Sequence, residues 1–181
     1  MSKKDISKSK FLSIVLRHEP EAVGVTLDEH GWIEVELLLM ALVAKGKTLS
    51  RPELDQLVCE SDKQRFAFSE DGLRIRANQG HSVKVDLELA PKFPPELLYH
   101  GTPGKFVDSI MKIGLLKGER HHVHLSPDIQ TATKVGERRG LPIILEIKSE
   151  DMHRAGHLFY VSANGVWLVD TVPPAFIREM A

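Results

Sequence analysis

The first half of the chain carries hydrophobic side chains at the spacing of amphipathic helices. A first helix ends just before Glu19-Pro20. Its apolar stripe consists of Phe11, Leu12, Val15 and Leu16. A second helix is predicted over residues 35–45, with Gly46 as its C-terminal stop. Its apolar face consists of Val35, Leu38, Leu39, Leu42 and Val43. A third helix begins at a capping box, in which Ser50 is the N-cap and Glu53 stands three residues further on.

The pattern changes to strand-like alternation after the third helix. Residues 65–69 and 73–77 alternate around Glu70-Asp71-Gly72, which predicts a β-hairpin. Helices followed by a hairpin indicate a winged-helix-like lobe. The prolines at 91, 94 and 95 then interrupt the pattern, so we expect two domains, residues 1–91 and 92–181.

The second half is richer in short apolar strands, which two helices separate. The strands are expected at residues 97–100, 123–125, 143–147, 158–161 and 166–169. The helices are expected at about residues 105–113 and 128–138, the second with Ser126 as its N-cap. Strands interrupted by helices predict an α+β lobe, and the whole chain is placed in the α+β class.

Composition and charge restrict the class of protein. Of the 181 residues, 42% are hydrophobic and 27% are charged, which is enough apolar material for a buried core. The single cysteine, Cys59, excludes a disulfide framework within the chain, so we expect a cytoplasmic location. We expect no membrane span, no export signal and no obligate protein partner. The formal net charge is -1, so a phosphate ligand has to be held at a focused site.

A basic dipeptide, Arg17-His18, stands at the predicted C-terminus of the first helix. The negative end of the helix dipole favours a protonated histidine there, so the pair is cationic. With Arg65 as a third member it would suit a phosphate dianion, because a guanidinium group donates two parallel hydrogen bonds to phosphate oxygens. The alternative is that Arg17 and His18 are simply solvated side chains at a helix end.

Polar side chains gather where the second hairpin strand runs into a turn. They are Arg76, Asn78, Gln79, His81 and Ser82. Polar groups on such a turn can contact RNA phosphates, sugars or exposed base edges. An ordinary solvated hairpin is the alternative.

Two histidine-containing segments in the second half are candidates for ligand binding. In Tyr99-His100-Gly101-Thr102 a glycine follows an apolar strand and would let a ligand approach the backbone, although a simple turn is the alternative. No G-x-G-x-x-G motif follows a strand, which disfavours a Rossmann-type NAD fold. His122 and His124 share one face of a strand, but no cysteine or acidic residue stands nearby at zinc-finger spacing, so no metal is expected.

Taken in order along the chain, these segments resemble the KptA-type RNA 2′-phosphotransferase family over essentially the whole sequence. The matching stretches are residues 10–18, 31–32, 63–66, 75–82, 98–102, 123–126, 135–138 and 164–168. The resemblance implies an N-terminal winged-helix lobe that binds the RNA 2′-phosphate. It also implies a C-terminal lobe of the ADP-ribosyltransferase type, of mixed α/β structure, that binds NAD.

The resemblance further implies roles for individual residues. The essential Arg-His-Arg-Arg tetrad of the family falls on Arg17, His18, Arg65 and Arg138. RNA contacts fall on Arg76, Asn78, Gln79, His81 and Ser82. The NAD cleft falls on His100, Gly101, Thr102, His124, Leu125, Ser126 and Val166. The sequence departs from the family at Arg139, where the pattern has histidine, which puts local substrate contacts in doubt.

The implied reaction removes an internal 2′-phosphate of the tRNA splice-junction type and consumes NAD as a co-substrate. The RNA 2′-phosphate, which Arg17, His18 and Arg65 would orient as the nucleophile, attacks C1″ of the NAD ribose and expels nicotinamide. This step leaves the phosphate ADP-ribosylated. The ribose O2″ then attacks phosphorus and releases 2′-OH RNA and ADP-ribose 1″,2″-cyclic phosphate. Arg138 would stabilise the phosphoryl oxygens in this second step, and no metal is required.

Two other functions stay open at this point. An ADP-ribosyltransferase acting on a nucleic-acid end or a protein would share only the first step, and the four cationic residues argue against it. A non-enzymatic winged-helix binding module would not need NAD. The near-neutral N-terminal half makes that module less attractive.

Overall fold

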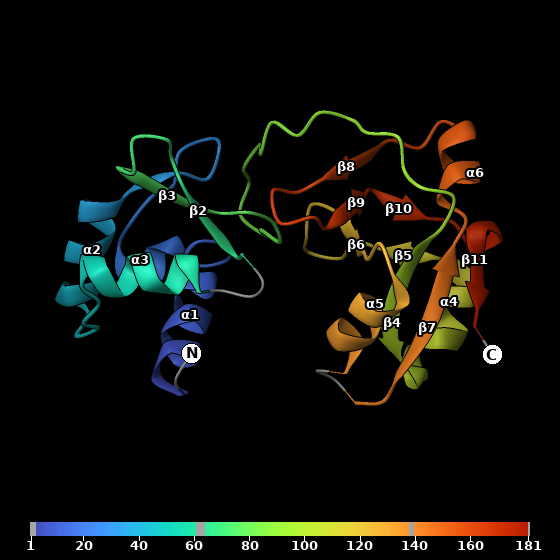
Figure 1. Ribbon diagram of the computed structural model, residues 1–181, viewed down its shortest axis with the longest axis horizontal. Coiled ribbons are helices and arrows are strands. Elements are labelled where there is room, and N and C mark those ends of the chain that lie inside the picture. Colours follow the sequence, from blue (N-terminus) through green and yellow to red (C-terminus); the bar gives the residue numbers. More distant parts are fainter. Residues whose placement is uncertain (1–2, 61–63, 138–139, 181) are drawn as a thin grey trace. The chain divides into compact units, whose positions relative to one another are not determined.

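The computed structural model describes residues 3–60, 64–137 and 140–180, which belong to two compact units (Figure 1). Unit 1 comprises residues 1–88 and unit 2 comprises residues 89–181, whereas the sequence pattern placed a boundary near residue 92. Both units combine helices with small antiparallel sheets, so the chain is of mixed α and β structure. Within the described ranges, no helix is both long enough and apolar enough to cross a membrane.

Unit 1 combines helices with an antiparallel sheet in the strand order β1-β3-β2. Its helices are α1 (Lys3–Val15), α2 (Val35–Ala44) and α3 (Arg51–Cys59), with the 3-10 turn η1 (Pro20–Val23) after α1. Its strands are β1 (Ile33–Glu34), β2 (Phe66–Phe68) and β3 (Arg74–Ala77). The predicted hairpin is confirmed as β2 and β3. The strand β1 was not predicted, because two residues are too few to display alternation.

Local hydrogen bonds explain where the helices of unit 1 begin and end. The amide of Glu53 donates to Ser50 Oγ at 3.4 Å, and the amide of Ser50 donates to Glu53 Oε2 at 2.9 Å. The predicted capping box at α3 is therefore confirmed. Gly46 follows α2 with a φ of +69°, a left-handed conformation that glycine adopts without steric cost, so the predicted stop is confirmed as well.

The hydrophobic core of unit 1 joins the three helices to one face of the sheet. Its most deeply buried members are Leu12, Leu16, Leu38, Leu42, Leu54 and Ile75. Side chains alternate along the strands, so Phe66, Ile75 and Ala77 enter the core while Arg74 and Arg76 face outward. Val43 was expected on the buried face of α2, but this is wrong, because that face is centred on Leu38 and Leu42 and leaves Val43 59% exposed.

Unit 2 alternates short strands and short helices. The strands are β4 (Leu98–Pro103), β5 (Leu115–Leu116), β6 (Val123–Leu125), β7 (Pro142–Ile147), β8 (Phe159–Val161), β9 (Trp167–Val169), β10 (Thr171–Val172) and β11 (Ile177–Glu179). The helices are α4 (Val107–Ile113), α5 (Ile129–Gly136) and α6 (Ser149–Arg154), with 3-10 turns η2 (Gly104–Phe106) and η3 (Pro174–Phe176).

The strands of unit 2 pair in small antiparallel sheets. Two of these sheets have the orders β11-β7-β4 and β6-β9-β8, and β10 pairs with β5. Backbone hydrogen bonds join the two larger sheets, because Tyr99 and Ser126 each donate to the other's carbonyl oxygen, at 2.9 and 2.8 Å. Side chains from both sheets fill the core of the unit, among them Leu98, Leu125, Leu145, Ile147 and Phe159.

Some elements of unit 2 differ from the prediction. Gly101 and Thr102 lie within β4 and not in a turn after it, because the strand stays in register with β7 as far as Pro103. The N-cap of α5 is Asp128, whose Oδ1 accepts a hydrogen bond from the amide of Thr131 at 2.7 Å. Ser126 is therefore not the N-cap, and α6, β5, β10 and β11 were not predicted.

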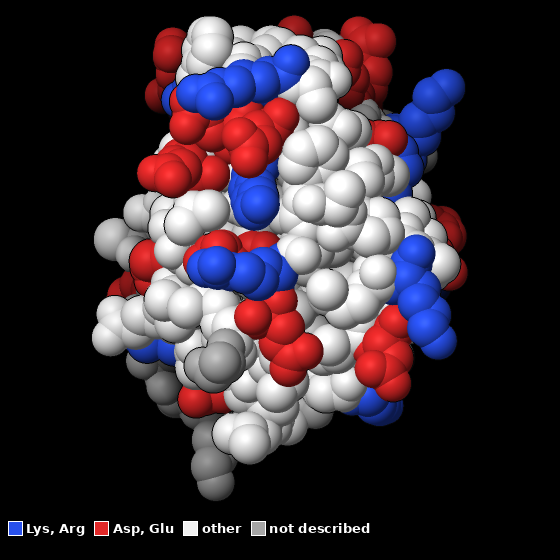
Figure 2. Space-filling model, turned by 90° about the vertical axis from the view of Figure 1, so that its right-hand side faces the viewer, with Lys and Arg blue, Asp and Glu red and all other residues white. Residues whose placement is uncertain are grey.

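Charged side chains of both signs are interspersed on one side of the molecule. Figure 2 shows the side on which α4, α6 and β11 lie in Figure 1, with acidic and basic groups next to one another. Within α6, Arg154 pairs with Glu150 at 2.6 Å, and Arg178 of β11 pairs with Glu146 of β7 at 2.8 Å. Opposite charges that neutralise one another locally give little long-range attraction for nucleic acid.

Candidate functional site

Arg17 and His18 lie just after Val15, the last residue of α1. The amides of His18 and Glu19 both donate to the carbonyl oxygen of Ile14, at 2.9 and 3.0 Å. These bonds prolong the last turn of the helix. Both side chains therefore stand at its negative end, as the pattern predicted.

Arg65 precedes β2 and contacts the end of α1. Arg17 Nη2 donates to the carbonyl oxygen of Arg65 at 3.4 Å, and Arg65 Nη1 donates to Ser9 Oγ at 3.2 Å. Both arginine side chains are half-buried, so their rotamers are restricted before any ligand arrives. Unit 1 thus brings together two predicted phosphate ligands that are 48 positions apart in the chain.

The turn after β3 packs against the same helix end. The amides of Ser82 and Val83 donate to the carbonyl oxygen of Arg17 at 2.9 and 3.2 Å. Ser82 Oγ and His18 Nδ1 are joined by a hydrogen bond of 2.9 Å, and both side chains are exposed. The structure therefore places one of the predicted RNA contacts, Ser82, beside the predicted phosphate ligands.

Other predicted RNA contacts are less accessible. Asn78 is 7% exposed and His81 is 1% exposed, while Gln79 is half-buried. Asn78 Nδ2 donates to the carbonyl oxygen of Gln64 at 2.5 Å, and its backbone amide donates to that of Arg65 at 2.9 Å. The side chains of Asn78 and His81 are thus buried within unit 1, and their contact with RNA stays a prediction.

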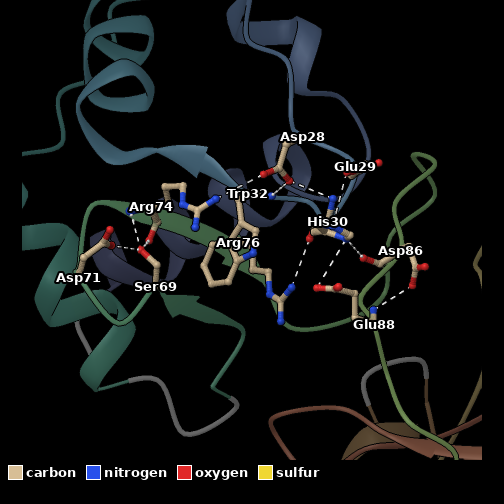
Figure 3. A network of polar contacts seen from close by, with 10 residues as sticks. All are labelled: Asp28, Glu29, His30, Trp32, Ser69, Asp71, Arg74, Arg76, Asp86 and Glu88. Atoms are coloured by element: carbon tan, nitrogen blue, oxygen red, sulfur yellow. Dashed lines mark hydrogen bonds and ion pairs between the residues drawn. The ribbon is translucent and has the colours of Figure 1, made fainter.

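Two arginines cover an indole ring on the outer face of the unit 1 sheet (Figure 3). The guanidinium carbons of Arg76 and Arg74 lie 4.4 and 5.6 Å from the centre of the Trp32 ring. Arg76 Nη1 donates to the carbonyl oxygen of His30 at 3.4 Å, and Arg74 Nη1 lies 3.7 Å from Asp28 Oδ2. Burial lowers the pKa of Arg76, but a guanidinium stays charged at neutral pH. The indole therefore orients Arg76, a predicted RNA contact, while leaving it cationic.

His30 fixes the last residues of unit 1 to the turn before β1 (Figure 3). Its Nδ1 donates to the carbonyl oxygen of Asp86 at 3.0 Å, and its ring nitrogens lie 3.6 and 3.7 Å from the carboxylates of Glu29 and Glu88. The hydrogen bond to Asp86, assisted by the neighbouring carboxylates, raises the pKa of His30. No local pattern predicts this group, since His30 and Asp86 are 56 positions apart.

In unit 2, His100 and His124 lie side by side where β4 meets β6. His100 Nδ1 donates to the carbonyl oxygen of His124 at 3.0 Å, and Arg120 Nη1 lies 3.4 Å from His124 Nδ1. Burial lowers the pKa of His100, so its ring is neutral at pH 7. Because Nδ1 carries the proton, Nε2 holds a lone pair that can accept a hydrogen bond. The structure thus brings together two segments that the sequence assigned to one ligand site.

Gly101 has a structural reason to be glycine. A Cβ at this position would stand 2.2 Å from the carbonyl oxygen of Ala132 and 3.3 Å from Gly136 Cα, so the glycine lets α5 pack directly on β4. Close approach of a ligand is not needed to account for it. Thr102 is 4% exposed and Leu125 is 1% exposed, so direct contact of either residue with a ligand stays a prediction.

Val166 and Ser126 lie at the same end of two paired strands. Val166 is half-buried and directly precedes Trp167, the first residue of β9, which pairs with Leu125 of β6. Arg138 and Arg139 lie outside the described residues. In the described part of the chain, no three His, Cys, Asp or Glu side chains are grouped as metal ligands would be.

Comparison with known proteins gives a consistent set of relatives. The family model described as RNA 2′-phosphotransferase, Tpt1 / KptA family, matches residues 3–171. A probable RNA 2′-phosphotransferase from Streptomyces griseus subsp. griseus is 54% identical over 182 aligned positions, which cover 97% of this chain and 96% of the relative. A protein of the same description from Flavobacterium johnsoniae is 55% identical over 95% of this chain and 94% of the relative. Another from Pseudomonas aeruginosa is 54% identical over 94% of this chain and 94% of the relative. The similarity therefore extends through both units.

Proposed function

This chain belongs to the Tpt1/KptA family of RNA 2′-phosphotransferases, which makes it a transferase that acts on RNA, and we propose that it transfers the phosphate to NAD. The proposed substrate is an RNA with an internal 2′-phosphate, of the kind left at tRNA splice junctions. The proposed products are 2′-OH RNA, nicotinamide and ADP-ribose 1″,2″-cyclic phosphate. NAD would supply the ribose carbon that takes up the phosphate, with nicotinamide as the leaving group.

The observation that carries this proposal is the convergence of Arg17, His18 and Arg65 at the end of α1. A phosphate dianion is bound best by guanidinium groups that are already oriented, since their planar donors match two phosphate oxygens at once. The contacts of Arg17 with Arg65 and of Arg65 with Ser9 provide this orientation. The near-neutral net charge of the chain agrees with a focused site.

Each residue of this site has a proposed task. Arg17 and Arg65 hold the phosphate oxygens and keep one of them directed at the electrophilic carbon. His18, whose Nδ1 is engaged by Ser82, presents Nε2 to the phosphate. Arg138 stabilises the phosphoryl oxygens in the second step. Fixed cations of this kind lower the barrier because phosphoryl transfer depends chiefly on positioning and on stabilisation of charge.

The residues proposed for NAD fit a ligand rich in hydroxyl groups. The neutral His100 ring can accept a hydrogen bond from a ribose hydroxyl through Nε2. Ser126 and Val166 lie at the same end of β6 and β9, and the buried residues Thr102 and Leu125 complete the proposed set. Gly101 contributes indirectly, because it sets the distance between α5 and β4.

The same proposal assigns a type to each unit. We infer that unit 1 is the winged-helix lobe, which agrees with its helices and its β2–β3 hairpin. We infer that unit 2 is the ADP-ribosyltransferase-like lobe, which agrees with its paired antiparallel sheets. A cytoplasmic location follows from the single cysteine and belongs to the same proposal.

The direct test uses a short RNA with one internal 2′-phosphate, incubated with the purified protein in the presence and absence of NAD. We expect loss of the phosphate only with NAD, together with ADP-ribose 1″,2″-cyclic phosphate. Dephosphorylation at the same rate without NAD would show that NAD is not the acceptor. Accumulation of an ADP-ribosylated RNA would mean that the chain performs the first step alone, as an ADP-ribosyltransferase does.

A further inference from the structure

The peptide that precedes Arg65 is held in an unfavourable backbone conformation. Gln64 has a φ of +38°, and among the described non-glycine residues only Glu88 shares a positive φ. A side chain on a left-handed residue collides with its own backbone, so such a conformation persists only where the surroundings enforce it. The side chain of Gln64 is exposed, and the enforcing contacts therefore act on its backbone.

Asn78 supplies these contacts. Its Nδ2 donates to the carbonyl oxygen of Gln64 at 2.5 Å, and its backbone amide donates to the carbonyl oxygen of Arg65 at 2.9 Å. A carbonyl oxygen only accepts hydrogen bonds, so the side-chain amide has to turn its nitrogen toward Gln64. Asn78, which follows β3, thus donates hydrogen bonds to the carbonyl oxygens of two successive residues, Gln64 and Arg65.

The same carbonyl oxygen of Arg65 also accepts a hydrogen bond from Arg17 Nη2, at 3.4 Å. Arg17 and Asn78 therefore converge on one acceptor whose position depends on the conformation of Gln64. When Asn78 fixes that conformation, it determines where the Arg65 side chain leaves the backbone. It also determines the position of the carbonyl oxygen that the Arg17 guanidinium contacts. The geometry of the two arginines is coupled through Asn78.

This arrangement is costly for the fold. Asn78 is 7% exposed, and within residues 3–60, 64–137 and 140–180 its buried Oδ1 has no hydrogen-bond partner. A buried acceptor without a donor destabilises the folded state, and a left-handed glutamine adds strain. Stability alone would be served better by a glycine at position 64 and an apolar side chain at position 78.

We infer that Asn78 is a positioning residue for the phosphate site, which holds Gln64 in its left-handed conformation and so fixes Arg65 relative to Arg17. The inference rests on the proposed role of Arg17 and Arg65 in binding the RNA 2′-phosphate. It assigns to Asn78 no contact with RNA. The residue acts through the backbone of the neighbouring strand.

The test compares steady-state kinetics of Asn78→Ala and the wild-type chain with 2′-phosphorylated RNA and NAD varied separately. We expect the KM for the RNA to rise by about five- to tenfold, the effect of one lost hydrogen bond, while the KM for NAD stays unchanged. Adding Gln64→Gly to Asn78→Ala should restore much of the KM for the RNA, because glycine adopts a positive φ without strain. Gln64→Ala in the same background is the matched control and should restore nothing.

Further variants separate this inference from the function on which it rests. If Arg65→Ala keeps wild-type activity, Arg65 does not bind the phosphate, and the inference is overturned as well. If Arg65→Ala is inactive but Asn78→Ala keeps the wild-type KM for RNA, only the inference is overturned. It is also overturned if Asn78→Ala raises both KM values equally and Gln64→Gly restores neither.

A second route is available if Asn78→Ala does not fold. Gln64→Val places a β-branched side chain at the left-handed position and leaves Asn78 in place. We expect it to raise the KM for RNA more than Gln64→Ala does, with the KM for NAD unchanged in both. Equal KM values for RNA in the valine and alanine variants would contradict the inference.

Discussion

His18 Nδ1 and Ser82 Oγ are joined by a hydrogen bond of 2.9 Å, although 64 positions separate the two residues. The amide of Ser82 also donates to the carbonyl oxygen of Arg17. The turn after β3 therefore fixes both the backbone of the basic dipeptide and the orientation of its imidazole. Hydrogen bonds of this kind keep a functional histidine in one rotamer.

Ser82→Ala should weaken the reaction without weakening the fold. The variant loses the hydroxyl that orients His18 but keeps the backbone bond to Arg17, so we expect kcat/KM for 2′-phosphorylated RNA to fall by about tenfold. Ser69→Ala, which removes a half-buried hydroxyl that is hydrogen-bonded to Asp71 in the β2–β3 turn, is the matched control. The same loss of kcat/KM in both variants would contradict an orienting role for Ser82.

Arg17→Lys should lose much of the activity even though it keeps the charge. Lysine cannot present two parallel donors to phosphate, and it loses the contact that Arg17 makes with the carbonyl oxygen of Arg65. We expect kcat/KM to fall by at least about tenfold. Arg51→Lys is the control, because Arg51 forms an exposed ion pair with Asp55 and should tolerate the change. Wild-type kinetics of Arg17→Lys would exclude two parallel hydrogen bonds from Arg17 to the phosphate.

Gly101→Ala should destabilise unit 2 strongly. The new Cβ would stand 2.2 Å from the carbonyl oxygen of Ala132, so α5 has to move away from β4. We expect a loss of about 3 kcal/mol in the free energy of unfolding, at the upper end of overpacking effects. Gly104→Ala is the control, because its Cβ would lie 3.8 Å from Ile143 Cγ1, an ordinary contact. Similar chemical denaturation midpoints for the two variants would show that α5 and β4 can separate at little cost.

His100 should make the fold less stable in acid. Burial lowers its pKa below the ordinary value of about 6.5, so the unfolded chain takes up this proton first as the pH falls. Its contribution to stability is therefore complete above about pH 6.5 and is lost below that value, as the pH falls toward the lowered pKa. His100→Asn, which can still donate to the carbonyl oxygen of His124, should lose less melting temperature between pH 7.5 and 5.5 than the wild type. Parallel melting curves would contradict this.

His30 should change the pH dependence of stability in the direction opposite to His100. Its hydrogen bond to Asp86 raises its pKa, so the folded chain binds the proton more tightly than the unfolded chain. The resulting stabilisation is complete below about pH 6.5 and is lost as the pH rises through the raised pKa. The difference in melting temperature between the wild type and His30→Asn should therefore be larger at pH 5.5 than at pH 8.5. A difference that does not change with pH would show that His30 titrates alike in both states.

Short-range patterns in the sequence predicted the elements of this fold well. The capping box at Ser50, the stop at Gly46 and the β2–β3 hairpin are all confirmed, because each depends on residues only a few positions apart. The order of the basic and histidine-containing segments was sufficient to indicate the family. The roles of the individual site residues stay predictions.

Long-range packing decided what the pattern alone did not reveal. The sequence by itself determined where most helices and strands lie and that Arg17-His18 closes the first helix, since these depend on local hydrogen bonds and side-chain period. Only the tertiary structure turned Asn78 inward onto Gln64, assigned Gly101 to the contact with α5, and brought Arg65 to Arg17. The physical reason is that burial and hydrogen-bond partners of these residues come from elements tens of positions away, which no local pattern encodes.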